Sequence, residues 1–157
     1  MKNPVECETA AIATVTQIDY DDVNKAIGRI ESLPDSIENP IFGNPFSLYV
    51  ALIRLGYWKK NITLNDLING NAEPMKTIVL VKKSLFEQHW VVYAGKENDN
   101  YKFFWGTIVD PVYLTKWKMV ELFTKDTGIN CAFQVYKSNI LRRAFMWLMF
   151  SILKLFD

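Results

Sequence analysis

The sequence changes its pattern once, near Pro74, and this change limits the fold more than any single residue does. Before Pro74, apolar residues recur at helical spacing behind capping residues, whereas the runs after it are rich in β-branched and aromatic residues, as strands are. Helices grouped before an antiparallel sheet are typical of α+β proteins. With 157 residues, the chain is long enough to bury one core of this kind without disulfides or metal.

Four helices are expected before Pro74, each with a recognisable start or end. They are a helix over about residues 7–16, one capped by Asp19, one that Asn44-Pro45 begins and Gly56 ends, and a short one capped by Thr63. The proline-containing segment over residues 32–43 predicts a loop. The first half of the chain is therefore expected to supply the helical layer.

The strands are expected after Pro74, together with one short helix. The expected strands are Thr77–Lys82, His89–Ala94, Tyr101–Trp105, Thr107–Val109 and Cys131–Tyr136, and the helix is Lys116–Lys125. The charged residues 95–100 predict a hairpin loop between the second and third strands. The continuous apolar run of the first strand is typical of a strand buried on both faces.

The chain ends in an apolar helix that stands apart from the rest of the sequence. Ser138 or Asn139 can cap it, and residues 140–156 are apolar except for Arg142, Arg143, Ser151 and Lys154. At about 1.5 Å per residue its length is about 25 Å, which is short for a bilayer. We consider three places for it: against its own domain, in a partner or oligomer, or in a membrane interface, of which the last is not favoured. The expected division is a domain over residues 1–137 and a helical tail over residues 138–157.

Composition excludes several classes of protein. Eighteen basic residues against seventeen acidic ones leave little net charge, which argues against a nucleic-acid partner. Two cysteines and one histidine provide neither a disulfide framework nor a zinc site, so no metal and no cofactor are expected. Lys2, Glu6 and Glu8 interrupt any signal peptide, so the cytoplasm is the expected location.

Three side chains can form a catalytic group. Cys7 begins the first expected helix, His89 begins a strand, and Asp110 precedes Pro111 twenty-one residues after the histidine. A helix N-terminus and a neighbouring imidazolium both favour a thiolate, and a carboxylate behind the imidazole fixes its tautomer. This order of residues is that of a thiol hydrolase.

Each of these residues also has a purely structural interpretation. A free cysteine is most often a small buried hydrophobe, and this is our interpretation of Cys131. His89 alone is more often a core histidine, and aspartate before proline often starts a turn. The functional interpretation of Cys7 therefore depends on His89 and Asp110 lying in register with it.

Several motifs follow one another in an order known from one family of enzymes. They are Glu6-Cys7-Glu8-Thr9-Ala10-Ala11, Tyr20-Asp21-Asp22-Val23, Leu55-Gly56-Tyr57, Thr63-Leu64-Asn65-Asp66-Leu67, His89-Trp90-Val91-Val92 and Asp110-Pro111. Over about residues 5–137, this set resembles the papain-like cysteine peptidases, most of all the bacteriocin-processing peptidases that remove double-glycine leaders and their stand-alone bacterial and phage relatives. The resemblance implies a papain-like fold, with N-terminal helices packed on an antiparallel sheet and the apolar helix added at the end.

The resemblance also assigns roles by position. Cys7 would be the nucleophile, His89 the general base and acid, and Asp110 the residue that orients the imidazole. The family's oxyanion glutamine lies six residues before the cysteine, where this chain has Met1, so Asn3 is the nearest oxyanion candidate. Gln88 is expected to point to the face of its strand opposite His89.

Two hypotheses follow from these residues. The first is a cysteine peptidase that cleaves a peptide or protein substrate through a thioester acyl-enzyme. The second is a catalytically impaired papain-like domain that serves as a structural or interaction component of a larger assembly, such as a phage particle, through its 140–156 helix. The expected location is then the cytoplasm, the host cytoplasm or the virion.

Overall fold

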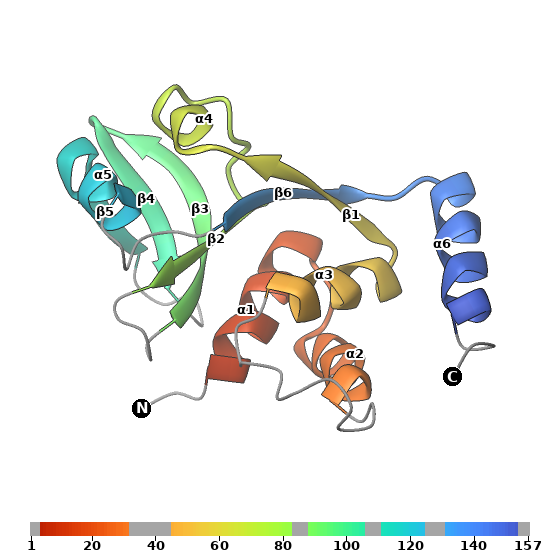
Figure 1. Ribbon diagram of the computed structural model, residues 1–157. Helices are drawn as coiled ribbons and strands as arrows, with labels where there is room; N and C mark the ends of the chain where they lie inside the picture. The colour runs from red at the N-terminus through yellow and green to blue at the C-terminus, as the bar shows by residue number, and fades with distance from the viewer. Residues whose placement is uncertain (1–3, 32–44, 83–87, 106–110, 125–130, 154–157) are drawn as a thin grey trace.

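The computed structural model describes residues 4–31, 45–82, 88–105, 111–124 and 131–153. The helices are α1 (Pro4–Thr16), α2 (Tyr20–Glu31), α3 (Pro45–Arg54), α4 (Leu64–Ile68), α5 (Lys116–Thr124) and α6 (Ile140–Leu153). The strands are β1 (Tyr57–Ile62), β2 (Thr77–Lys82), β3 (Gln88–Glu97), β4 (Asn100–Trp105), β5 (Pro111–Thr115) and β6 (Cys131–Lys137). This is the predicted α+β architecture, with α1, α2 and α3 gathered on one side of the sheet (Figure 1).

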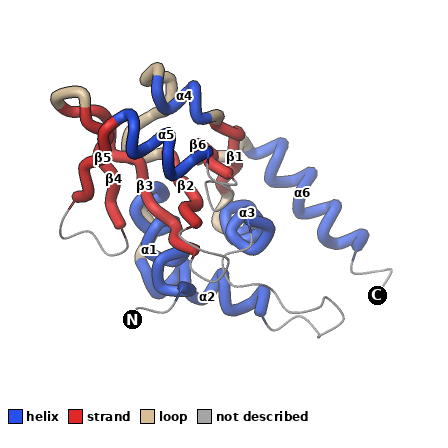
Figure 2. The backbone as a smooth tube through the Cα atoms, turned by 60° about the vertical axis from the view of Figure 1, so that its left-hand side comes forward, coloured by secondary structure: helices blue, strands red, loops and turns tan. Residues whose placement is uncertain are grey.

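One antiparallel sheet organises the molecule, with its strands in the order β1-β6-β2-β3-β4-β5. Successive residues of a strand point to opposite faces, and β2 shows why its run is apolar throughout. Ile78 and Leu80 belong to the core shared with α1, α2 and α3. Val79 and Val81 belong to a second core, shared with α4 and α5. The sheet is therefore covered by helices on both faces, as Figure 2 shows from another side.

Helix α1 is the central helix of the larger core. Ala10, Ala11 and Ile12 are buried, and so are the polar residues Glu8 and Thr9 just before them, as expected where other elements surround a helix. The helix packs on β3, and its alanines keep the helix close to the strand. It begins at Pro4 rather than at about Cys7, so the expected start was three residues too late. Cys7 lies in the first turn and not ahead of it.

The predicted capping residues have the expected roles. The Asp19 carboxylate accepts from the Asp21 amide at 2.9 Å, at the start of α2. Thr63 and Asp66 form a complete capping box at the start of α4. Gly56 ends α3 with a φ of +86°, a left-handed conformation that suits glycine. Asn139 caps α6 by accepting from the Arg142 amide at 2.8 Å.

Two strands and one turn differ from the predictions. Strand β1, which pairs with β6 at one edge of the sheet, was not predicted, because Lys59, Lys60 and Asn61 hide any alternation of apolar and polar residues. Strand β5, which pairs with β4 at the other edge, was not predicted either. The expected six-residue hairpin loop is a two-residue turn, in which Asn98 and Asp99 have φ values of 48° and 63°. Such a pair of left-handed residues matches the twist of the strands. The expected strand 107–109 lies outside the described residues.

Helix α6 is set apart from the body of the protein (Figure 1). Leu141 is 80% exposed and Trp147 is 73% exposed, and no residue of α6 belongs to either core as far as the structure describes them. The option that this helix completes the core of its own domain is therefore wrong for the described side chains. Among the described residues, no helix combines the length and the apolar character needed to cross a membrane.

Candidate active site

The candidate nucleophile lies at the beginning of the buried central helix. Cys7 is the fourth residue of α1 and is only 5% exposed. The first turn of a helix carries partial positive charge from its amide groups, which favours a thiolate. The environment of Cys7 is thus electrostatically suitable, and at the same time enclosed.

The candidate base lies at the beginning of the strand on which α1 packs. His89 is the second residue of β3, pairs with Val81 of β2, and is partly buried. Its Nδ1 atom is 3.8 Å from the Cys7 Sγ atom, within the range of a hydrogen bond that involves sulfur. The structure therefore brings together the predicted cysteine and the predicted histidine.

The packing of α1 on β3 explains this contact. Trp90 and Val92 of β3 belong to the same core as Ala11 and Ile12 of α1, so the helix and the strand hold each other in register. The first turn of α1 and the first residues of β3 lie at the same end of the sheet (Figure 1). Because both partners are on packed elements rather than on loops, the pair is held in position before any substrate binds.

Glu8, which follows Cys7, is part of the buried surroundings of the pair. It is 4% exposed, and the next residue, Thr9, is fully buried. A charge beside a thiol matters less when it is turned to solvent, but Glu8 is not turned to solvent.

The remaining predicted site residues lie outside the described part of the chain. These are Asp110, the expected orienting residue, and Asn3, the expected oxyanion donor. The side chain of Gln88 and that of Cys131 are also outside it, although the backbones of both residues are in strands. The roles of Asp110 and Asn3 therefore stay predictions.

The tryptophans near the site divide into a buried and an exposed class. Trp90 is 1% exposed and packs on Phe133 with a ring-centroid distance of 5.6 Å. Trp117, on α5, is 84% exposed and belongs to neither core. Trp90 is thus the aromatic residue that supports the strand next to His89.

The fold has a counterpart among solved structures. The peptidase domain of Streptococcus ComA, a bi-functional ABC transporter involved in a quorum sensing pathway, superimposes with a TM-score of 0.61 over 88% of this chain and 96% of that chain. The chain has the papain-like fold. The predicted fold and its resemblance to papain-like peptidases are thereby confirmed.

The sequence similarity behind this papain-like fold is low. The two chains are 15% identical, so the likeness concerns the fold and leaves the chemistry to be argued from the site. No protein-family model matches the sequence, and no curated protein does.

Proposed function

We propose that the protein is a papain-like thiol hydrolase, and that it cleaves peptide bonds in a peptide or protein substrate. The observation that carries the proposal is the 3.8 Å contact between Cys7 Sγ and His89 Nδ1. A thiol becomes a strong nucleophile when an adjacent base takes its proton and a helix N-terminus favours the resulting charge. Both conditions point to the same sulfur atom, in the fold where cysteine peptidases use them.

The reaction would proceed in two steps. The Cys7 sulfur attacks the carbonyl carbon, and the proton held by His89 passes to the leaving amine as the C–N bond breaks. The acyl group is then bound to Cys7 as a thioester. His89 next removes a proton from water, which attacks the thioester and releases the acid, so that the thiol receives its proton back. No cofactor enters either step.

The proposal assigns two further roles from the sequence. Asp110 would hold the His89 nitrogen that faces away from Cys7, Nε2, and stabilise the imidazolium. Asn3 would donate to the oxyanion, and the loss of such a donor typically lowers the rate about 100- to 1,000-fold. The proposed location is the cytoplasm, or the virion for a phage-encoded chain.

One observation favours a second candidate function, a papain-like domain without turnover that binds other proteins. Cys7 and Glu8 are 5% and 4% exposed, whereas a nucleophile has to be reached by its substrate. In this case the Cys7–His89 pair would be a remnant within a structural component of an assembly. The two candidates differ in whether the thiol reacts.

Alkylation of Cys7 by iodoacetamide separates them. We expect wild-type Cys7 to react quickly at pH 6, and we expect the rate to fall at least about 10-fold in His89→Ala, because the imidazolium no longer supports the thiolate. Mass spectrometry of the modified peptide distinguishes Cys7 from Cys131, and Cys7→Ala provides the control. Equal, slow rates in wild type and His89→Ala would contradict the hydrolase and leave the binding domain.

Turnover needs its own measurement. A peptidyl probe that forms a covalent bond with nucleophilic cysteines should label the wild type and leave Cys7→Ala and His89→Ala unlabelled. A mixture of peptides followed by mass spectrometry then reports cleavage. Labelling without cleavage would identify an activated thiol whose substrate was absent from the mixture, and a reactive thiol that no peptidyl probe reaches would argue against peptide substrates.

A further inference from the structure

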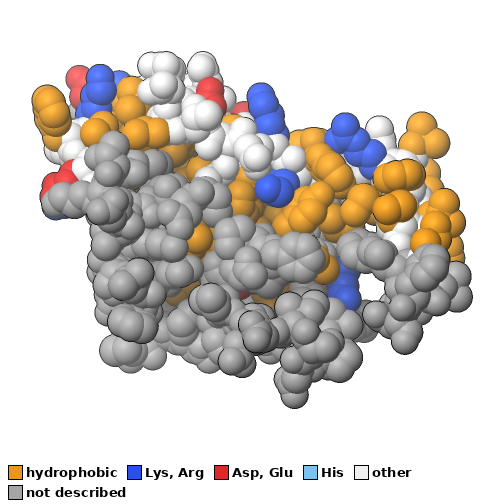
Figure 3. All heavy atoms as spheres, in the orientation of Figure 1, with side chains coloured by type: hydrophobic (Ala, Val, Ile, Leu, Met, Phe, Trp, Pro, Cys, Tyr) orange, Lys and Arg blue, Asp and Glu red, His pale blue; other side chains and the backbone are white. Residues whose placement is uncertain are grey.

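A cavity of about 640 Å³ lies between α6 and the body of the protein, and neither Cys7 nor His89 lines it. Its volume is in the range of about 300–1,000 Å³ that is typical of sites for small molecules. Its large apolar side chains, from the end of α3, the start of β1 and the first turns of α6, are Ile53, Leu55, Trp58, Ile140, Met146 and Trp147. Figure 3 shows apolar side chains gathered at the α6 end of the molecule. The cavity therefore suits a ligand that is mainly apolar.

Water reaches the wall of the cavity that α6 provides. Ile140 and Trp147 line the cavity and yet are 81% and 73% exposed. The removal of apolar surface from water is favourable in proportion to the area that is removed. A ligand chain in the cavity would cover both side chains, so its binding would be driven by burial that the free protein does not achieve.

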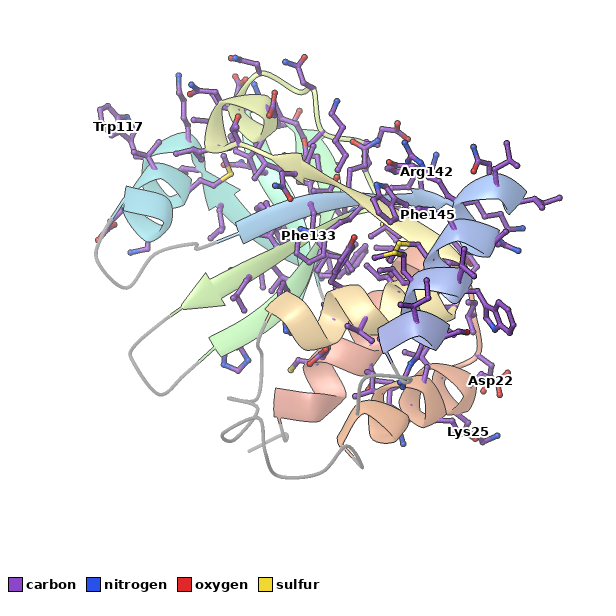
Figure 4. All side chains as sticks on the ribbon, turned by 45° about the vertical axis from the view of Figure 1, so that its right-hand side comes forward. Asp22, Lys25, Trp117, Phe133, Arg142 and Phe145 are labelled. Carbon is purple, nitrogen blue, oxygen red and sulfur yellow. The ribbon has the colours of Figure 1, made fainter. Side chains whose placement is uncertain are left out.

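Two arginines attach α6 to the body beside this cavity. The Arg143 guanidinium donates to the Gly56 carbonyl at 3.2 Å and lies against the Gly56 backbone, where a Cβ atom would be 2.7 Å from Arg143 Nη2. The Arg142 guanidinium donates to the Tyr136 hydroxyl at 3.0 Å and lies 5.2 Å from the centre of the Trp58 ring. Figure 4 shows Arg142 on α6 beside the β1–β6 edge. The first turn of α6 is thus attached through long side chains rather than by close packing, which leaves space for the cavity.

The cavity also carries positive charge that no carboxylate neutralises among the described residues. Arg54 and Arg143 both line it, and each donates to a neutral carbonyl, Arg54 to that of Ala26 at 3.4 Å and Arg143 to that of Gly56. The ion pairs between described residues all involve lysines. A guanidinium has five N–H groups and keeps its charge at every physiological pH, so most donors of both arginines remain for an anion. The charge of the cavity therefore complements a carboxylate.

We propose that the cavity binds an anionic amphiphile with one alkyl chain, namely a free fatty acid. The chain would lie along Trp58, Met146 and Trp147. The carboxylate would bind to Arg54 and Arg143 through charge-assisted hydrogen bonds. The apolar wall thus accounts for one end of the ligand and the unneutralised charge for the other. This site is separate from the Cys7–His89 pair, and the proposal does not depend on the proposed hydrolase.

Isothermal titration calorimetry of the full chain with decanoate tests the proposal, and decanol provides the same chain without the charge. We expect decanoate to bind with a Kd on the order of 100 µM, as a ligand of about twelve heavy atoms allows. Decanol should bind at least about 5-fold more weakly, because it forms no charge-assisted hydrogen bonds with the arginines. Acetate, which has the charge without the chain, should not bind measurably.

Variants on two elements locate the ligand. Trp147→Ala removes part of the apolar wall and should weaken the binding of decanoate and of decanol at least about 5-fold. Trp117→Ala is the matched control, since Trp117 is 84% exposed but lies on α5. Arg54→Gln leaves the attachment of α6 intact, and it should weaken decanoate at least about 5-fold while decanol binds as before. Circular dichroism verifies that the three variants fold.

Three results would overturn the proposal. The first is no binding of decanoate up to about 5 mM. The second is equal binding of decanoate by the wild type and Trp147→Ala, which would place the ligand outside the cavity. The third is binding to phosphatidylglycerol vesicles without binding of free decanoate, which would make this end of the protein a membrane contact. Because Cys7 alkylation is measured separately, none of these results bears on the proposed hydrolase.

Discussion

Cys7 and His89 are separated by 82 residues in the chain and by 3.8 Å in the structure, and the sequence predicted their meeting only through the order of its motifs. Spacing along one element could not show it, because the contact depends on how α1 lies on β3. That arrangement is set by the alanines of α1 and by Trp90 and Val92 of β3. The pairing of a thiol with an imidazole could therefore be predicted from the residue types, whereas the burial of Cys7 could be seen only in the folded structure.

Trp90 gives a residue-scale prediction about how this contact is supported. Its ring is buried on Phe133, and its Nε1 atom has no acceptor among the residues that the structure describes. Trp90→Ala should lower the free energy of unfolding by about 3–5 kcal/mol, because it empties the core beside His89. Trp90→Phe should cost less than about 2 kcal/mol, since it keeps an aromatic ring and removes the unpaired N–H group. Urea unfolding of both variants would show the difference, and equal losses would indicate that the N–H group is bonded after all.

At the scale of elements, the predictable parts are those whose signals are local. The capping residues Asp19 and Thr63 fixed two helix starts correctly, because an N-cap acts on amides two or three residues away. Strand β1 could not be found this way, since its pairing partner β6 comes about seventy residues later and supplies its hydrogen bonds. An edge strand that contains Lys59 and Lys60 lacks the continuous apolar run that identifies a strand buried on both faces.

The capping box of α4 predicts a pH-dependent contribution to stability. Hydrogen bonds from the Thr63 amide and hydroxyl lower the pKa of the Asp66 carboxyl. A lowered folded-state pKa contributes stability above the unfolded value of about 3.9 and loses it as the pH falls through the folded value. Thr63→Ala should therefore be less stable than the wild type at pH 7, and the difference should shrink below about pH 4.

Thermal unfolding at a series of pH values measures this difference. Asn65→Ala, an exposed change on the same helix, serves as the control and should alter stability by less than about 0.5 kcal/mol at every pH. A gap between wild type and Thr63→Ala that stays constant down to pH 2 would show that the carboxylate of Asp66 contributes nothing to the box.

At the scale of the whole molecule, the candidate active site and helix α6 lie in different parts of the protein (Figure 1). The Cys7–His89 pair lies where α1 meets β3, beside the larger of the two cores, whereas α6 is attached at the β1–β6 edge. The reactivity of Cys7 should accordingly be independent of α6.

Removal of α6 tests that independence and the expected boundary after residue 137. A chain that ends at Ser138 loses the Arg143–Gly56 hydrogen bond and the contacts of Arg142 with Tyr136 and Trp58, all at the surface, and keeps both cores. Contacts of this kind contribute about 0.5–1.5 kcal/mol each, so the shortened chain should fold and should unfold roughly 3–18 °C below the full chain. It should react with iodoacetamide at the wild-type rate. A shortened chain that fails to fold would instead make α6 part of the papain-like domain, because its removal would then have exposed a surface that the domain cannot leave open to water.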